Sequence, residues 1–122
     1  MTVLALVLAG ALGAPLRLVV ERAASTRWAG AFPIGTFLVN VTGSLALGIV
    51  VGLTASGTFD ADTRTIVGTG FLGAYTTFST YAYETVRAAE GGRRGVAAAY
   101  ALSSIVAGVA AAAVGLALTG AL

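Results

Sequence analysis

Polar side chains that can donate hydrogen bonds recur within apolar stretches of this 122-residue sequence. Asn40 lies near the middle of one such stretch, and Thr36 precedes it by four residues, so both would share one face of a helix. Tyr100 and Ser104 repeat this spacing in a later stretch. Amide and hydroxyl groups donate hydrogen bonds, and the pattern predicts no carboxylate beside them at mid-stretch. Such a lining suits an anion better than a cation, although Asn40 could equally clamp two helices together.

A second group of small and polar residues lies between Gly70 and Tyr81, in the run Gly-Phe-Leu-Gly-Ala-Tyr-Thr-Thr-Phe-Ser-Thr-Tyr. Its hydroxyls could bond back to carbonyls of an unbroken helix, with the glycines at close contacts. Alternatively, the helix breaks here and its freed main-chain groups line a cavity or bind an ion. The extra length of this stretch favours the break. Phe78 and Tyr81 would add rings whose edges are electropositive.

The elements that carry these residues are predicted to be four membrane-spanning helices. Hydrophobic residues make up 57% of the chain and charged residues only 10%, whereas soluble domains carry about 25% charged residues. A helix needs about 20 apolar residues to cross the hydrocarbon core. The stretches that qualify are Thr2–Val20, Pro33–Thr54, Thr63–Ala89 and Gly95–Ala121. We therefore expect an all-α membrane protein, with residues 1–122 forming a single four-helix domain whose third helix is broken near mid-membrane.

The composition also excludes several kinds of function. The chain has neither cysteine nor histidine, which removes disulfides, thiolates and the commonest general base and metal ligand. We therefore expect no enzyme. Its seven basic residues form no basic stripe, so we expect no nucleic-acid partner. Gly48 and Gly52 form a small-xxx-small pair that predicts a close helix contact.

The arginines are distributed unevenly between the two ends of the predicted bundle. All basic residues are arginine, and six of them lie in or near the first and third linkers, against Arg64 alone on the other side. The positive-inside rule then places those linkers in the cytoplasm and both termini outside. Arg17 is the one charge that could lie inside a span. It either snorkels to the interface or lines an anion entrance.

Three blocks of the sequence, residues 10–17, 35–44 and 70–81, resemble the Fluc (CrcB) family of fluoride channels. They fall in the first three predicted helices in the family's order, and the third block is the most specific. The resemblance implies an antiparallel two-subunit channel with two pores. It also implies a sodium ion at the dimer centre, held by main-chain carbonyls of Gly73 and Thr76.

The resemblance also assigns residues to the ion pathway. Asn40 matches the asparagine that contacts fluoride, Phe78 matches the first aromatic of a paired-ring constriction, and Tyr81 replaces the usual second phenylalanine. Arg17 matches the arginine of the first helix. The remaining residues implied along the fluoride pathway are hydroxyl-bearing: Thr36, Ser79, Thr80, Tyr100 and Ser104.

The function implied is passive, fluoride-selective export across the cell membrane, which would reduce fluoride toxicity. The principal alternative is a small multidrug-type proton-coupled transporter, which needs a carboxylate inside the membrane. Another is a non-transporting assembly subunit. The partner could be a second copy of this chain or an oppositely biased homologous subunit, since a six-to-one arginine distribution should favour one orientation.

Overall fold

The computed structural model describes residues 1–122 and consists of helices and their connections. Its elements are α1 Thr2–Arg27, α2 Ile34–Ala55, α3 Ala61–Arg64, the π-helical η1 Thr65–Leu72, α4 Gly73–Tyr75, α5 Ser79–Glu90 and α6 Arg94–Leu118. The prediction of an all-α chain is therefore confirmed. The third predicted span is the run from α3 to α5.

Three helices, α1, α2 and α6, are long and apolar enough to cross a membrane, with mean hydropathies of 2.2, 1.9 and 2.2. Large apolar side chains such as Leu12 and Val106 are 68% exposed, as lipid-facing residues would be. The chain is thus a multi-pass membrane protein. The predicted end of the first helix at Val20 is wrong, because α1 continues to Arg27. Main-chain hydrogen bonds continue through Glu21 and Arg22, since charged residues do not stop a helix that has left the hydrocarbon.

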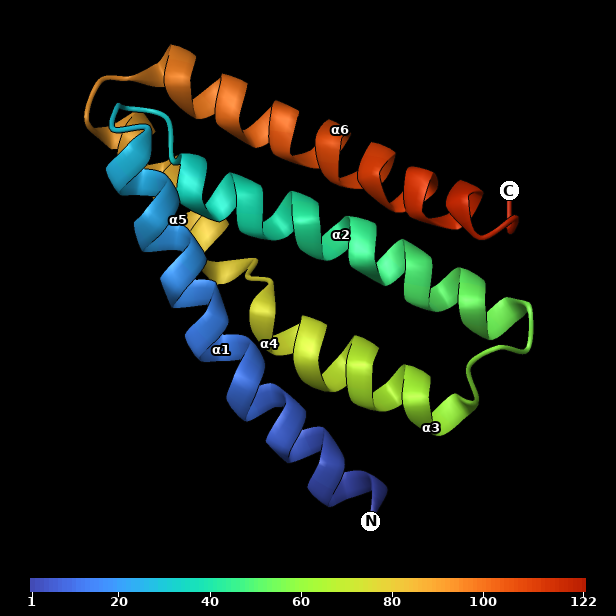
Figure 1. The fold of residues 1–122 in the computed structure, drawn as a ribbon. Coiled ribbons are helices and arrows are strands. Elements are labelled where there is room, and N and C mark those ends of the chain that lie inside the picture. Colours follow the sequence, from blue (N-terminus) through green and yellow to red (C-terminus); the bar gives the residue numbers. More distant parts are fainter.

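Helix α2 lies between α6 and the third span, and α1 packs on α2 and on the first half of the third span (Figure 1). The predicted glycine contact is confirmed: a Cβ at Gly48 would collide with the carbonyl of Ala112, and one at Gly52 with the hydroxyl of Thr119. Because glycine has no side chain, the backbones of α2 and α6 approach closely and gain van der Waals contact. On the opposite side of α2, a small buried cluster fills the space toward the third span; its members are Val39, Val50, Leu72 and Tyr75.

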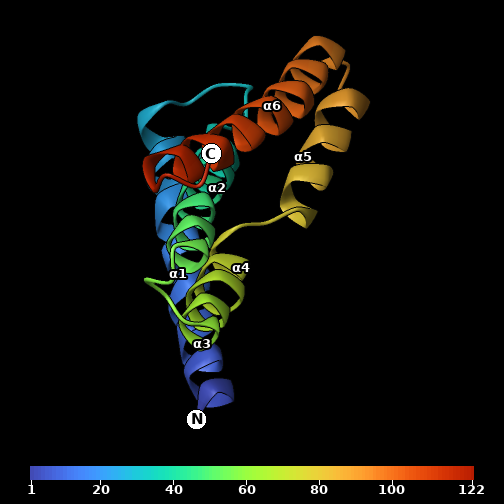
Figure 2. The same cartoon turned by 90° about the vertical axis from the view of Figure 1, so that its right-hand side faces the viewer.

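The third span is broken, as predicted, at residues 76–78. Thr76 is extended, with φ −80° and ψ 162°, and the helix resumes at Ser79. Figure 2 shows α5 turned away from α4 and lying beside α6, joined to α4 by an extended link. The break therefore divides the span into a half that packs on α1 and a half that packs on α6.

Candidate functional site

Asn40 on α2 pairs with the main chain of the break. Its Nδ2 donates to the Thr77 carbonyl and its Oδ1 accepts from the Thr77 N–H, both at 2.8 Å. These two groups lost their helical partners when the chain left the helix, and a main-chain group buried without a partner is costly. Asn40 therefore holds the break open. An amide nitrogen carries two N–H groups, so the second N–H of Asn40 can still donate to another acceptor.

Hydroxyl groups gather where α5 begins. The Thr80 N–H donates to Thr77 Oγ1 over 3.2 Å, and the Thr77 hydroxyl donates to Thr80 Oγ1 over 3.0 Å. Ser79 Oγ lies 3.4 Å from the same Thr77 oxygen. Thr77 thus satisfies an unpaired donor of the first helical turn, in the manner of a cap. The structure brings Asn40, Ser79 and Thr80 into one cluster through Thr77, which was not among the predicted site residues.

The two predicted rings lie side by side after the break. The centroids of Phe78 and Tyr81 are 5.6 Å apart at an interplanar angle of 45°. Phe78 is 79% exposed, so its ring projects from the single chain. The Tyr81 hydroxyl donates to the carbonyl of Ala101 on α6 over 3.0 Å. The hydroxyl that distinguishes Tyr81 from phenylalanine is therefore bonded to the α6 main chain.

A carboxylate lies among the predicted donors, contrary to our expectation. Thr36 Oγ1 donates to Glu84 Oε1 over 3.1 Å, and the Tyr100 hydroxyl donates to Glu84 Oε2 over 2.8 Å. Thr36 is 3% exposed and Tyr100 is fully buried. Glu84 was not identified as a site residue from the sequence. Glu84 follows Thr80 by four residues and Tyr81 by three, and residues at these spacings share a helix face. This spacing was the sequence signal that could have placed Glu84 beside the predicted donors.

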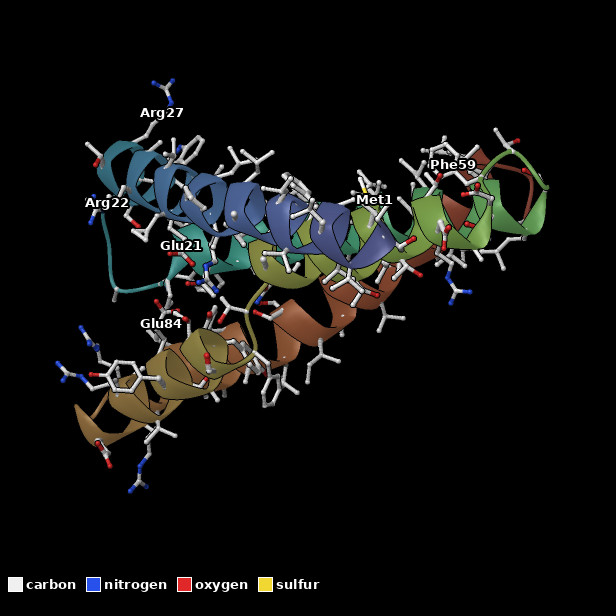
Figure 3. The ribbon with its side chains drawn as sticks, turned by 90° about the horizontal axis from the view of Figure 1, so that it is seen from below. Met1, Glu21, Arg22, Arg27, Phe59 and Glu84 are labelled. Carbon is white, nitrogen blue, oxygen red and sulfur yellow. The ribbon has the colours of Figure 1, made fainter.

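A second acidic residue points into the same region. Glu21 on α1 and Glu84 on α5 project toward the gap between these helices, as Figure 3 shows, and Glu21 Oε1 is buried without a hydrogen-bond partner. Arg17 lies one turn before Glu21 and is half-buried. Ser104, one turn after Tyr100 on α6, likewise has a buried hydroxyl without a partner. The polar row on α6 thus continues past Tyr100.

A cavity of about 300 Å³ opens beside the break. Its lining includes Asn40, Gly73, Thr76, Thr77 and Phe78. The main-chain carbonyls of Gly73 and Thr76 accept no hydrogen bond, because the Thr77 N–H donates to Asn40 and the Thr80 N–H donates to Thr77 Oγ1. Free carbonyl oxygens are ligands that suit a hard cation. These two positions therefore fit the predicted sodium site.

Comparison with known proteins gives the family. The model of the family described as CrcB-like protein, Camphor Resistance (CrcB), matches residues 4–116. The chain belongs to the CrcB-like family. It is 47% identical over 108 residues to Fluoride-specific ion channel FluC 1 of Streptomyces avermitilis, covering 88% of this chain and 87% of that protein.

Two further relatives of this CrcB-like chain match nearly their full length. A protein named Fluoride-specific ion channel FluC 1 from Frankia casuarinae is 50% identical over 119 residues, covering 93% of this chain and 92% of its own. A protein named Fluoride-specific ion channel FluC 2 from Cutibacterium acnes is 42% identical over 119 residues, covering 97% of both chains. These matches favour the channel interpretation over the small multidrug-type transporter.

Within this CrcB-like fold, the predicted site residues form two connected groups. Asn40, Ser79 and Thr80 surround the break, and Thr36 and Tyr100 meet at Glu84. The Tyr81 ring links the groups, because its centroid lies 5.4 Å from that of Tyr100 and 5.6 Å from that of Phe78. No recorded hydrogen bond joins Arg17 or Ser104 to either group.

Proposed function

We propose that this chain is the subunit of a fluoride-selective channel that lets cytoplasmic fluoride leave the cell passively. The observation that carries the proposal is the polar series between α2, α5 and α6, which runs from Thr36 and Tyr100 to Asn40 and the break. Its groups are hydrogen-bond donors held in place by packed helices. Relatives that match nearly the whole chain are named fluoride-specific ion channels, which supports the same conclusion and a channel in place of an enzyme.

Export needs no covalent chemistry. Hydrogen fluoride crosses a membrane as a neutral acid and dissociates in a less acidic cytoplasm. The trapped anion then leaves down its gradient, driven further by the inside-negative potential. Along the path it exchanges water for the donors of Asn40 and the hydroxyls, while the edges of Phe78 and Tyr81 contribute a weakly positive field.

Glu84 gives this path a property that donors alone would not supply. Its carboxylate already accepts the hydroxyls of Thr36 and Tyr100, so an entering anion competes with it for those donors. Conduction requires that an ion bind well enough to enter and weakly enough to leave. Competition with a tethered carboxylate keeps binding weak and favours release.

The channel is completed by a second subunit in antiparallel orientation, each chain contributing one four-helix domain. The Phe78 ring projects from the single chain at 79% exposure, and it also lines the cavity at the break. A second copy would cover both. The carbonyls of Gly73 and Thr76, together with the same carbonyls of the second subunit, would hold a sodium ion between the two chains. The positive ion would offset the repulsion between carbonyl oxygens that face each other.

The second subunit is either the same chain or an oppositely biased homologue. Six of the seven arginines lie toward one end, and such a distribution should hold the chain in one orientation. A C-terminal tag probed for accessibility from both sides of the cell membrane would decide between the two. Labelling from one side only favours a paired homologue, and substantial labelling from both sides supports a homodimer.

Liposome efflux tests the proposal directly. The chain is purified, reconstituted alone or with a candidate partner, and fluoride release is followed with an ion-selective electrode, with chloride-loaded vesicles as the selectivity control. Asn40→Asp keeps the acceptor for the Thr77 N–H but replaces the donating nitrogen with an anionic oxygen, so fluoride release should be lost. Thr54→Val, on the same helix but bonded only to Val50 O, should leave it intact. Equal chloride and fluoride release, or drug-driven proton uptake, would contradict the proposal.

A further inference from the structure

An apolar hollow lies where α1 ends and α2 begins, and its lining residue Phe32 also packs against Tyr100, with ring centroids 5.4 Å apart. Its volume is about 430 Å³, and it is lined by the linker and the first turns of α2: Trp28, Ala29, Gly30, Ala31, Phe32, Ile34 and Leu38. Helix α1 has 26 residues, so it is about 39 Å long and exceeds a hydrocarbon core of about 30 Å. The end that carries this hollow therefore lies in the headgroup region, where tryptophan is typically found.

Two exposed arginines, Arg22 and Arg27, lie at the end of α1 that adjoins the hollow. The Arg27 guanidinium lies over the Trp28 ring, 5.6 Å from its centroid. Figure 3 shows Arg22 and Arg27 projecting outward from this end of α1, whereas Glu21 points inward toward Glu84. The neighbouring acid therefore does not neutralise the two arginines at the surface. An apolar hollow near two exposed positive charges suits an amphiphile with an acidic headgroup.

We propose that this hollow binds an anionic phospholipid of the cytoplasmic leaflet. An acyl chain would lie against Ile34 and Leu38, and the phosphate would meet Arg27 and Arg22. The cytoplasmic leaflet follows from the arginine distribution, and it is also the leaflet in which anionic lipids attract basic residues near the surface. The proposal depends on membrane insertion with the arginine-bearing end in the cytoplasmic leaflet, and not on which ion the protein conducts.

Trp28 makes the site directly measurable, because it is the only tryptophan in the chain. The protein is reconstituted in vesicles in which a fixed fraction of lipid carries bromine on the acyl chain, either as phosphatidylglycerol or as phosphatidylcholine. Bromine quenches only nearby tryptophan. A basic residue near a membrane surface favours an acidic lipid by about fivefold, so brominated phosphatidylglycerol should quench Trp28 at severalfold lower mole fraction than brominated phosphatidylcholine.

Matched variants separate a site from general surface charge. Quenching is expressed relative to unbrominated vesicles for each variant, which corrects for the loss of the Arg27 contact with the ring. The double variant Arg22→Gln, Arg27→Gln should lose the preference, and Arg27→Lys should keep most of it. Arg94→Gln removes one charge from the first residue of α6, which is not part of the hollow and whose helix begins near the end of α1 (Figure 1), and should keep the preference. Equal quenching by both lipids, or a loss in Arg94→Gln as large as in the double variant, would overturn the proposal.

Discussion

The two halves of the broken span are held by different forces. The half before the break, η1 and α4, packs on α1 through glycines: a Cβ at Gly13 would collide with the Phe71 carbonyl, and one at Gly70 would lie 2.8 Å from the Leu6 carbonyl. The half after the break, α5, is attached to α6 by side-chain hydrogen bonds: Tyr81 donates to the Ala101 carbonyl, and Glu84 accepts from Tyr100. Close backbone packing positions the first half rigidly, whereas the second half presents polar groups that an ion can use.

Asn40 divides these halves, so its removal should have the largest effect. Asn40→Ala deletes both bonds to Thr77 and leaves two main-chain groups unpaired, at about 1–3 kcal/mol each. We expect fluoride flux to fall by about two orders of magnitude, since about 3 kcal/mol corresponds to roughly 100-fold. Efflux from liposomes measures this. Flux within a few-fold of wild type would show that the break does not depend on the amide.

The glycine packing of the first half can be tested on neighbouring turns of α1. Gly13→Ala places a methyl group against the Phe71 carbonyl, with the Phe71 C and Tyr75 N each at 3.2 Å, and overpacking of this kind costs about 1–3 kcal/mol. Gly10→Ala meets its nearest neighbour, the Gly70 carbonyl, at an ordinary 3.5 Å. Thermal unfolding in detergent should therefore show a lower midpoint for Gly13→Ala only. Equal midpoints would contradict the close packing.

Two tyrosines sharpen the description of the second half. Tyr100→Phe removes a donor to Glu84, and Tyr81→Phe removes a donor to the Ala101 carbonyl. Each loss should lower stability by about 0.5–1.5 kcal/mol, more where the bond involves a charged group. Only Tyr100→Phe should also change the fluoride concentration at half-maximal flux, because the Tyr81 hydroxyl is bonded to the α6 main chain. A larger change in that fluoride concentration for Tyr81→Phe than for Tyr100→Phe would contradict this assignment.

The smallest effect concerns α3, the short helix that precedes η1. Asp60 caps α3, accepting the Thr63 N–H at 2.8 Å, and side-chain and main-chain hydrogen bonds from Thr63 hold the pKa of Asp60 below its ordinary value. The cap therefore stabilises α3 fully above about pH 3.9, and this contribution disappears as pH falls through the lowered pKa. The protection factor of the Thr63 amide, which is the intrinsic exchange rate at each pH divided by the observed rate, should fall in acid in the wild type. Asp60→Asn, which still caps but does not titrate, should show no such fall.

Many residues of the candidate site could be identified from the sequence, and those that were missed share one cause. The donors Asn40, Thr36 and Tyr100 were identified by their spacing, and the close contact at Gly48 by its small-xxx-small pattern. Glu84 was not identified from the sequence. Its partners lie 48 and 16 residues away, and no local pattern specifies such contacts.

The sequence by itself determined the membrane class, the apolar spans, the series of donors and the presence of a break in the third span. These follow from hydropathy, helical periodicity and the weakness of a helix rich in glycine and hydroxyl residues, all of which act over a few residues. The tertiary structure alone decided that the break spans residues 76–78, that Asn40 pairs with Thr77, and that Glu84 lies among the donors. Each of these depends on groups distant in the chain satisfying one another's hydrogen bonds, which only the packed helices can arrange.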